Sequence, residues 1–308
     1  IPGLPGDAYV TTPKTIDDYT LERTPDNASG TMTDELTTIT YEYLLNASVT
    51  SKYVDKETGK ELAPSETYNG QEGKDYETEN KDIKYYKLVE IPSDASGKYE
   101  VDRTTNPYTT TKEVIYYYIP KVFDLSVSKK ISNITINGKA QDLNDGKIEK
   151  IEIEDKTIND VDVRVEYAIV LSNIGELNGS ANIVENIPDG FEFVAEDNEN
   201  YWTVEDGKLV TKVENIDPEQ EITLVVKLRW KNSEENLGKL TNVVKISDTK
   251  NPAEFKEINL DNNEDSCDTI VEIKKGAVSM LPWIISAIVL VSGTLVTFSY
   301  VSKKKSLQ

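Results

Sequence analysis

The chain has 308 residues and a formal net charge of −21, because 55 acidic residues outnumber 34 basic ones. An acidic balance of this size argues against nucleic-acid binding, which needs basic surface to replace the counterions at phosphates. The sequence contains no histidine and a single cysteine, Cys267, so it lacks the commonest general base and cannot form an intrachain disulfide.

Two Ala-Ser-Gly segments, beginning at Ala28 and Ala95, belong to an internal repeat. A shift of 67 residues, from Ala28 to Ala95, also aligns other glycines, tyrosines and prolines of the two copies: Gly3 with Gly70, Tyr9 with Tyr76, Tyr19 with Tyr86, and Pro25 with Pro92. So many matches at one offset indicate a tandem repeat of one structural unit.

The second copy, residues 46–119, contains all the elements of a small β module. Strands are predicted at 47–55, 84–92 and 113–119, where tyrosines alternate with β-branched residues, and a turn at Gly59. The first copy, residues 1–43, has no counterpart of residues 46–67. We therefore expect it to be truncated, and the natural chain to continue upstream of residue 1.

Four segments of the second copy, "YVDKETGKELA", "YNGQEGKDYET", "YYKLVEIPSDASGKY" and "EVIYYYI", carry a family resemblance. They resemble the mucin-binding-protein (MucBP) repeat of Gram-positive surface proteins, over all of 46–119 and part of 1–43. The resemblance implies β-grasp-like modules that stand in tandem on adhesins, some of which bind mucin. It implies no particular binding residues.

Exposed tyrosines are the candidate ligand contacts in the second copy, because their rings combine a flat apolar face with a hydroxyl group. Strand alternation places about half of them outside, and we take Tyr85 and Tyr117 as candidates. Packing in the core is the alternative role for each of these side chains.

Residues 120–275 contain strand-like runs separated by Gly, Pro, Asn and Asp, which predicts an immunoglobulin-like β-sandwich. The segments "YAIVLSNIGEL", "NIPDGFEFV" and "LTNVVKIS" resemble the conserved-repeat sandwich of bacterial surface proteins. This resemblance implies an extracellular stalk. The acidic stretch 260–268 is expected to be a solvated loop in which the Cys267 thiol is exposed.

Some sandwiches of this class carry an isopeptide bond between a lysine and an asparagine, assisted by a buried carboxylate. In this chain, alternation points Lys129 and Asn242 inward, and a buried lysine that loses its charge is a nucleophile. Glu166 is the candidate carboxylate, although its position next to inward-facing Tyr167 argues against it. The alternative is that no bond forms.

The segment from Ala277 to Tyr300 carries no charge and matches the ~20 residues that a membrane-spanning helix needs. We predict a transmembrane helix at 277–301. Lys303, Lys304 and Lys305 then mark the tail, residues 302–308, as cytoplasmic. No Leu-Pro-x-Thr-Gly sorting motif precedes the helix, so direct membrane anchorage is expected.

Together these features predict a mainly β protein and a membrane-anchored bacterial surface adhesin. Its expected partners are host mucin or other glycoprotein glycans, with the membrane at its C-terminal end. The alternative is a passive stalk that displays an upstream binding domain. An enzyme is not expected: no nucleophile motif, phosphate loop or metal-ligand spacing occurs, so no catalytic residue, metal or cofactor is assigned.

Overall fold

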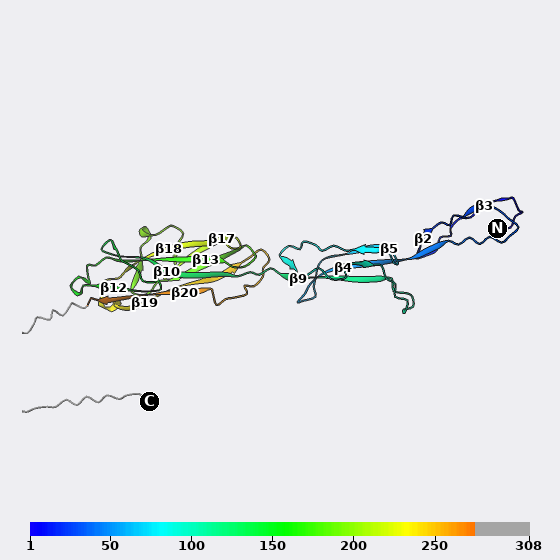
Figure 1. The fold of residues 1–308 in the computed structure, drawn as a ribbon. Coiled ribbons are helices and arrows are strands. Elements are labelled where there is room, and N and C mark those ends of the chain that lie inside the picture. The colour runs from blue at the N-terminus through cyan, green and yellow to red at the C-terminus, as the bar shows by residue number, and fades with distance from the viewer. Residues whose placement is uncertain (275–308) are drawn as a thin grey trace, which may run out of the picture.

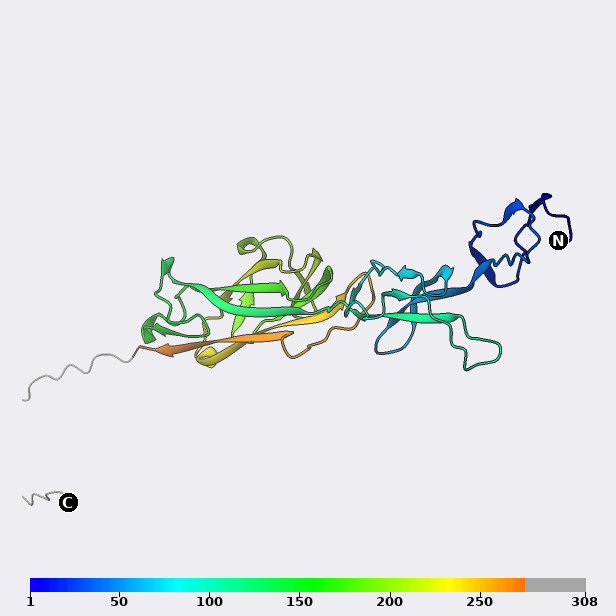
Figure 2. The ribbon, with the colours of Figure 1, turned by 45° about the vertical axis from the view of Figure 1, so that its right-hand side comes forward.

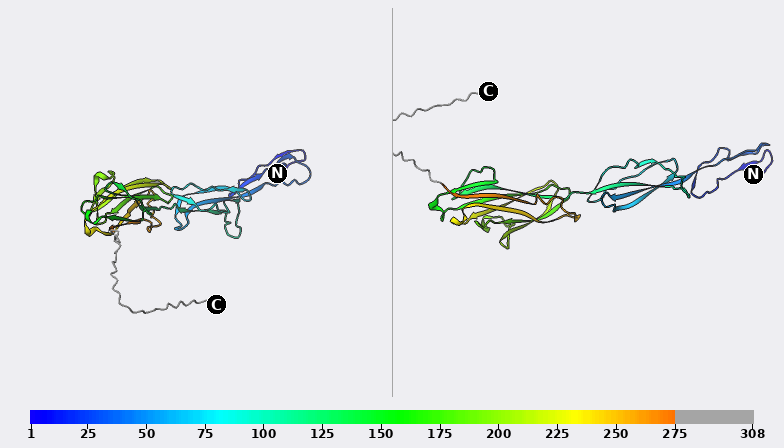
Figure 3. Two further views of the ribbon diagram at one scale, coloured as in Figure 1. Left: turned by 60° about the vertical axis from the view of Figure 1, so that its left-hand side comes forward. Right: turned by 90° about the horizontal axis from the view of Figure 1, so that it is seen from below.

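The computed structural model describes residues 1–274, and in this range the protein is built from strands with three short 3-10 helices. Three units follow one another in an elongated row: the first copy of the repeat, the second copy and the sandwich (Figure 1). The same row is seen from other directions (Figures 2 and 3). The 3-10 helices all belong to the sandwich: η1 (Asp155–Thr157), η2 (Ala195–Asp197) and η3 (Glu234–Asn236).

The two copies of the repeat have the same strand pairings. In the first copy β1 (Ala8–Val10) pairs with β3 (Ser29–Thr31), and β2 (Tyr19–Arg23) pairs with the start of β4 (Glu42–Asp55). In the second copy the corresponding pairs join β6 (Asp75–Glu77) to β8 (Ser96–Lys98), and β7 (Tyr86–Leu88) to β9 (Thr111–Pro120). Even the registers agree, since Tyr9 faces Gly30 in one copy and Tyr76 faces Gly97 in the other.

The second copy adds β5 (Glu61–Gln71), and its sheet has the order β5-β4-β9-β7. The two central strands, β4 and β9, run parallel, as in a β-grasp sheet, but residues 46–119 contain no α-helix to cover them. Tyrosines form much of the core, and the rings of Tyr53 and Tyr116 stack with their centroids 5.6 Å apart.

Strand β4 passes through both copies without a break. Its first residues, up to Leu45, pair with β2 of the first copy, and from Asn46 onward it pairs with β5 of the second. The copies are therefore joined by a continuous extended strand and not by a flexible linker.

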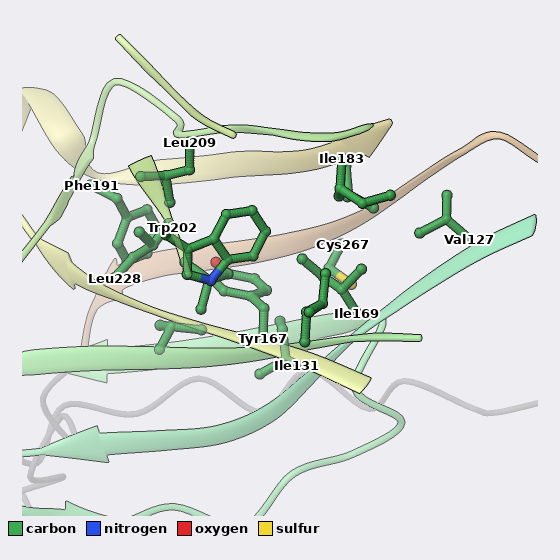
Figure 4. Packing of buried hydrophobic residues seen from close by; sticks show 14 of the residues in the cluster. Val127, Ile131, Tyr167, Ile169, Ile183, Phe191, Trp202, Leu209, Leu228 and Cys267 are labelled. Atoms are coloured by element: carbon green, nitrogen blue, oxygen red, sulfur yellow. The ribbon is translucent and has the colours of Figure 1, made fainter. Parts of the chain in front are cut away.

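The sandwich consists of two sheets whose inner faces share one hydrophobic core (Figure 4). One sheet has the order β11-β10-β13-β18-β15; its strands are β10 (Leu125–Ile136), β11 (Lys139–Ala140), β13 (Val163–Asn173), β15 (Phe191–Phe193) and β18 (Glu221–Trp230). The other has the order β12-β20-β19-β14-β17-β16; its strands are β12 (Ile148–Ile153), β14 (Gly179–Asn186), β16 (Thr203–Glu205), β17 (Lys208–Ile216), β19 (Gly238–Lys250) and β20 (Glu264–Ile273).

The second copy packs directly onto the sandwich. Tyr86 meets Phe255 edge to face, with ring centroids 5.7 Å apart. Glu176 of the sandwich accepts hydrogen bonds from the Lys87 ammonium at 2.8 Å and from the Val122 backbone N–H at 2.8 Å. This junction, like the one between the copies, is made of specific contacts.

The expected acidic loop was wrong for most of its length, because β20 starts at Glu264 and the Cys267 side chain is buried in the sandwich core. Across residues 1–274, no helix combines the length and the hydrophobicity needed to cross a bilayer. The predicted span 277–301, with Ala277 and Tyr300, and the tail with Lys303, Lys304 and Lys305 lie outside the described residues.

Candidate functional site

A polar cleft of about 710 Å³ lies where the two copies of the repeat meet. It is formed by the segment before β2, the middle of β4, the end of β5 and the loop before β9: Asp17, Asp18, Tyr19, Leu45, Asn46, Ala47, Ser48, Asn69, Gly70, Gln71, Pro107, Tyr108 and Thr110. The cleft exists only because β4 holds both copies in register.

The cleft combines two exposed aromatic rings with amide and carboxylate groups. Tyr108 is 50% exposed and Tyr19 is 40% exposed. Arg103, which pairs with Glu72, lies over the Tyr108 ring at 5.8 Å from its centroid. Flat apolar faces beside hydrogen-bonding groups suit a sugar ring, which presents both C–H surfaces and hydroxyls.

The two tyrosines predicted as ligand contacts lie in different surroundings. Tyr117 is 42% exposed on the outer face of β9. Tyr85 is half-buried, packs against the edge of the sandwich core, and accepts a hydrogen bond from the Lys121 N–H through its carbonyl oxygen. The structure therefore assigns Tyr85 to the junction with the sandwich, and it does not bring the two tyrosines together.

A second unusual site is a cluster of polar side chains buried between the two sheets of the sandwich, which we name the buried polar cluster: Lys129, Tyr167, Glu185, Asn242, Cys267 and Thr269. Lys129 on β10 and Glu185 on β14 come from opposite sheets, and the Lys129 Nζ lies 2.5 Å from the Glu185 Oε1 with both side chains fully buried. The Lys129 Nζ also lies 4.8 Å from the centroid of the Tyr167 ring.

Strand register brings Asn242 to this pair. Glu185 faces Val244 on the neighbouring strand β19, and Asn242 is two residues from Val244, so Glu185 and Asn242 are diagonal neighbours on the same inner face. Asn242 is fully buried, and neither its Nδ2 nor its Oδ1 makes a hydrogen bond of good geometry, although the amide lies close enough to Glu185 and to the Tyr167 hydroxyl to oppose the rise in pKa of both groups. A buried amide left without partners is costly and rare, and it calls for an explanation.

Burial controls the protonation of the ion pair. Desolvation lowers the pKa of Lys129, an effect that the Glu185 charge opposes. Desolvation also raises the pKa of Glu185, an effect that the charge of Lys129 and the neighbouring Asn242 amide oppose. Both directions favour transfer of the proton from the ammonium to the carboxylate, which leaves a neutral amine beside a carboxylic acid.

Glu166, the carboxylate considered from the sequence, is not part of this cluster. It lies on the outer face of β13, where it pairs with Lys227 at 3.5 Å and accepts a hydrogen bond from the Ser132 hydroxyl. Sequence reasoning missed Glu185 because it missed β14. The alternation of Ala181, Ile183 and Glu185 was the available signal, and a charge ends that series.

The repeat region matches a known domain family. Residues 1–44 and 48–119 match the MucBP domain. Residues 1–119 belong to the MucBP family. Internalin J from two Listeria monocytogenes strains is similar to this chain, at 45% identity over 116 residues and 46% over 113 residues. These alignments cover 36% and 35% of this chain but only 14% and 12% of the two Internalin J chains.

Comparison with solved structures finds distant similarity. BcpA, the major pilin subunit of Bacillus cereus, aligns with a TM-score of 0.32 and 15% identity, covering 73% of this chain and 69% of BcpA. The CARDB domain of the PF1109 protein from Pyrococcus furiosus aligns with a TM-score of 0.27 and 14% identity, covering 50% of this chain and 96% of that domain. TM-scores this low do not establish a shared fold.

Proposed function

We propose that the chain is part of a bacterial surface adhesin, in which tandem MucBP modules bind glycans of host mucin or another glycoprotein. The observation that carries the proposal is the MucBP match of both copies in tandem. The modules are β-grasp-like in their strand order, and the sandwich holds them away from the cell surface. No catalytic role is proposed.

The cleft between the copies is the proposed binding surface. Its exposed rings, Tyr19 and Tyr108, stand beside the amides of Asn69 and Gln71 and the carboxylates of Asp17 and Asp18. The rings of such a surface can stack on a sugar ring, and its polar groups can hydrogen-bond the sugar hydroxyls. The sugar does not need to carry a charge for this binding. The acidic overall charge also makes nucleic acid an unsuitable ligand.

A passive stalk is the second candidate function, and the continuous strand β4 favours it. A stalk must keep its modules in line, and an unbroken strand shared by two modules does this better than a loop. In this case an upstream domain would bind the ligand. The cleft would then result from the way the two copies are joined and would have no binding function.

Binding of residues 1–274 to immobilised mucin glycoprotein distinguishes these functions. We expect concentration-dependent binding by the wild type, and about tenfold or greater weakening by the double substitution Tyr19→Ala and Tyr108→Ala, because exposed aromatic anchors dominate such contacts. Tyr117→Ala, which removes an equally exposed ring outside the cleft, is the matched control.

The outcomes separate the alternatives. If only the Tyr19→Ala and Tyr108→Ala double variant binds mucin more weakly, the result supports the cleft as the binding site. If only Tyr117→Ala binds more weakly, the binding site lies on the outer face of β9. Absence of binding by the wild type would leave the stalk as the function of this part of the chain.

We further propose that residues 277–301 anchor the protein in the cell membrane, with residues 302–308 in the cytoplasm. The uncharged segment from Ala277 to Tyr300, followed by Lys303, Lys304 and Lys305, supports this proposal. In fractionated cells the chain is expected in the membrane fraction, resistant to extraction at high salt and released by detergent. Release by salt alone would contradict a spanning anchor.

A further inference from the structure

We propose that the sandwich closes an isopeptide bond between the Lys129 Nζ and the Asn242 Cγ, with Glu185 as the residue that moves the protons. The proposal rests on the buried polar cluster and does not depend on glycan binding by the repeat modules. It replaces Glu166, which lies on the other face of β13.

The first reason is the placement of the three side chains. Lys129 reaches across the core from β10 and lies within 2.5 Å of the Glu185 carboxylate, while Asn242 is the diagonal neighbour of Glu185 on the facing sheet. All three side chains are excluded from water. Water therefore neither protonates the amine nor competes with it as a nucleophile.

The second reason is the unpartnered amide. Both polar atoms of Asn242 lack hydrogen bonds of good geometry although the residue is completely buried beside Glu185. A buried ion pair beside an unsatisfied amide contributes little to the stability of the folded state. Its presence in the core therefore has no evident structural reason. The same three groups are the reactants of an amide-forming step.

The reaction balances without any oxidant or cofactor. The neutral amine of Lys129 attacks the Asn242 Cγ while the Glu185 carboxylic acid donates a proton to the amide. Glu185 then takes up the proton that the amine nitrogen loses, and the Cγ–Nδ2 bond breaks. One secondary amide and one ammonia are formed, and Glu185 returns to its protonated state.

The position of the bond gives it a mechanical consequence. It would join β10 to β19 of the other sheet. Along the chain, β10 is the first strand of the sandwich and β19 is the last but one. Tension passing from the repeat modules to the C-terminal end would then cross the bond and bypass residues 130–241. The two sheets could not separate under load without breaking a covalent bond.

Mass spectrometry of the purified full chain tests the proposal. The wild type is expected to be lighter than its sequence mass by one ammonia, about 17 Da. Trypsin is expected to leave Lys129 uncleaved, because its amine is acylated, and to release a branched peptide that joins Lys129 to Asn242. The branched peptide is required as a readout because succinimide formation at an Asn-Gly step, such as Asn137-Gly138, also releases ammonia.

Substitutions at the cluster supply the controls. Lys129→Arg, Asn242→Ala and Glu185→Gln are each expected to have the full sequence mass. Glu166→Gln, the same change at a carboxylate outside the cluster, is expected to keep the deficit and the branched peptide. If the cluster variants fail to fold, the wild-type peptide map alone decides: a linear peptide ending at Lys129 and a linear peptide containing Asn242 would overturn the proposal.

Discussion

At the scale of single residues, Cys267 shows how the core sets the chemistry of a side chain. It lies on the inner face of β20, opposite Asn242 of β19, and is 1% exposed. Burial raises the pKa of its thiol to about 11, although the charge of Lys147 acts in the opposite direction. Because the thiolate is the reactive form, burial protects Cys267 in two ways. It keeps reagents away from the sulfur, and it keeps the thiol protonated.

This protection predicts that Cys267 does not react in the native protein. A rise of the pKa from 9.0 to about 11 lowers the thiolate fraction about a hundredfold at neutral pH. With a thiol reagent at about pH 8, the native chain is expected to remain unlabelled, and the chain in denaturant to take up one label. A Ser128→Cys variant, with its new thiol on the exposed side of β10, is the control for native labelling. Native labelling of the wild type at the rate of that control would contradict the predicted burial.

At the scale of elements, strands with clear hydrophobic alternation were predictable from sequence, including β10 and β19 with one polar residue each on the inner face, whereas β14 and β20 were not. β13 and β18 present hydrophobic residues at every second position, so their existence and inward faces were predicted. β14 and β20 place Glu185, Cys267 and Thr269 on the inner face, so their alternation is weak. Local pattern placed Lys129 in the core, but it could not identify Glu185, the partner of Lys129 on the opposite sheet.

The boundary between the repeat copies illustrates the same limit. The repeat itself was predictable, and its strand registers confirm it. Alignment of the two copies with each other nevertheless ends the first copy at residue 43 and starts the second at residue 46. The structure has the unbroken strand β4 at this place. Nothing in the local pattern distinguishes the end of one copy from the start of the next, because the partners of the strand change there while its extended backbone does not. The cleft that depends on this shared strand was therefore missed.

At the scale of the whole molecule, the junction between the second copy and the sandwich decides how well the units stay in line. Its contacts combine the Tyr86–Phe255 ring pair with the hydrogen bonds that Glu176 accepts from Lys87 and from the Val122 N–H. Tyr85 contributes here as well, which explains why a tyrosine expected at a binding surface is half-buried. An exposed ion pair contributes little to unfolding stability, but one at a junction restricts the angle between two domains.

The protonation of Glu176 gives this junction a predicted pH dependence. The hydrogen bond from Lys87, followed by that from the Val122 N–H, lowers the pKa of Glu176 below its usual value. A carboxyl group with a lowered pKa in the folded state contributes its interactions above its unfolded pKa, about 4.3, and loses them as the pH falls through the folded value. The junction should therefore be held at neutral pH and loosen in acid.

Distances between spin labels at Lys60→Cys and Lys208→Cys, one on each side of the junction, measure this loosening. We expect a narrow distribution for the wild type at about pH 7 and a broader one once the pH has fallen below the lowered pKa of Glu176, as followed by acid titration of the doubly labelled chain. Glu176→Gln should be broad at both ends of this titration, because a neutral amide cannot replace the ion pair with Lys87. Glu264→Gln, which removes an exposed ion pair with Lys245 away from the junction, should behave as the wild type. Equal widths for Glu176→Gln and the wild type at neutral pH would show that the aromatic contact alone holds the domains in line.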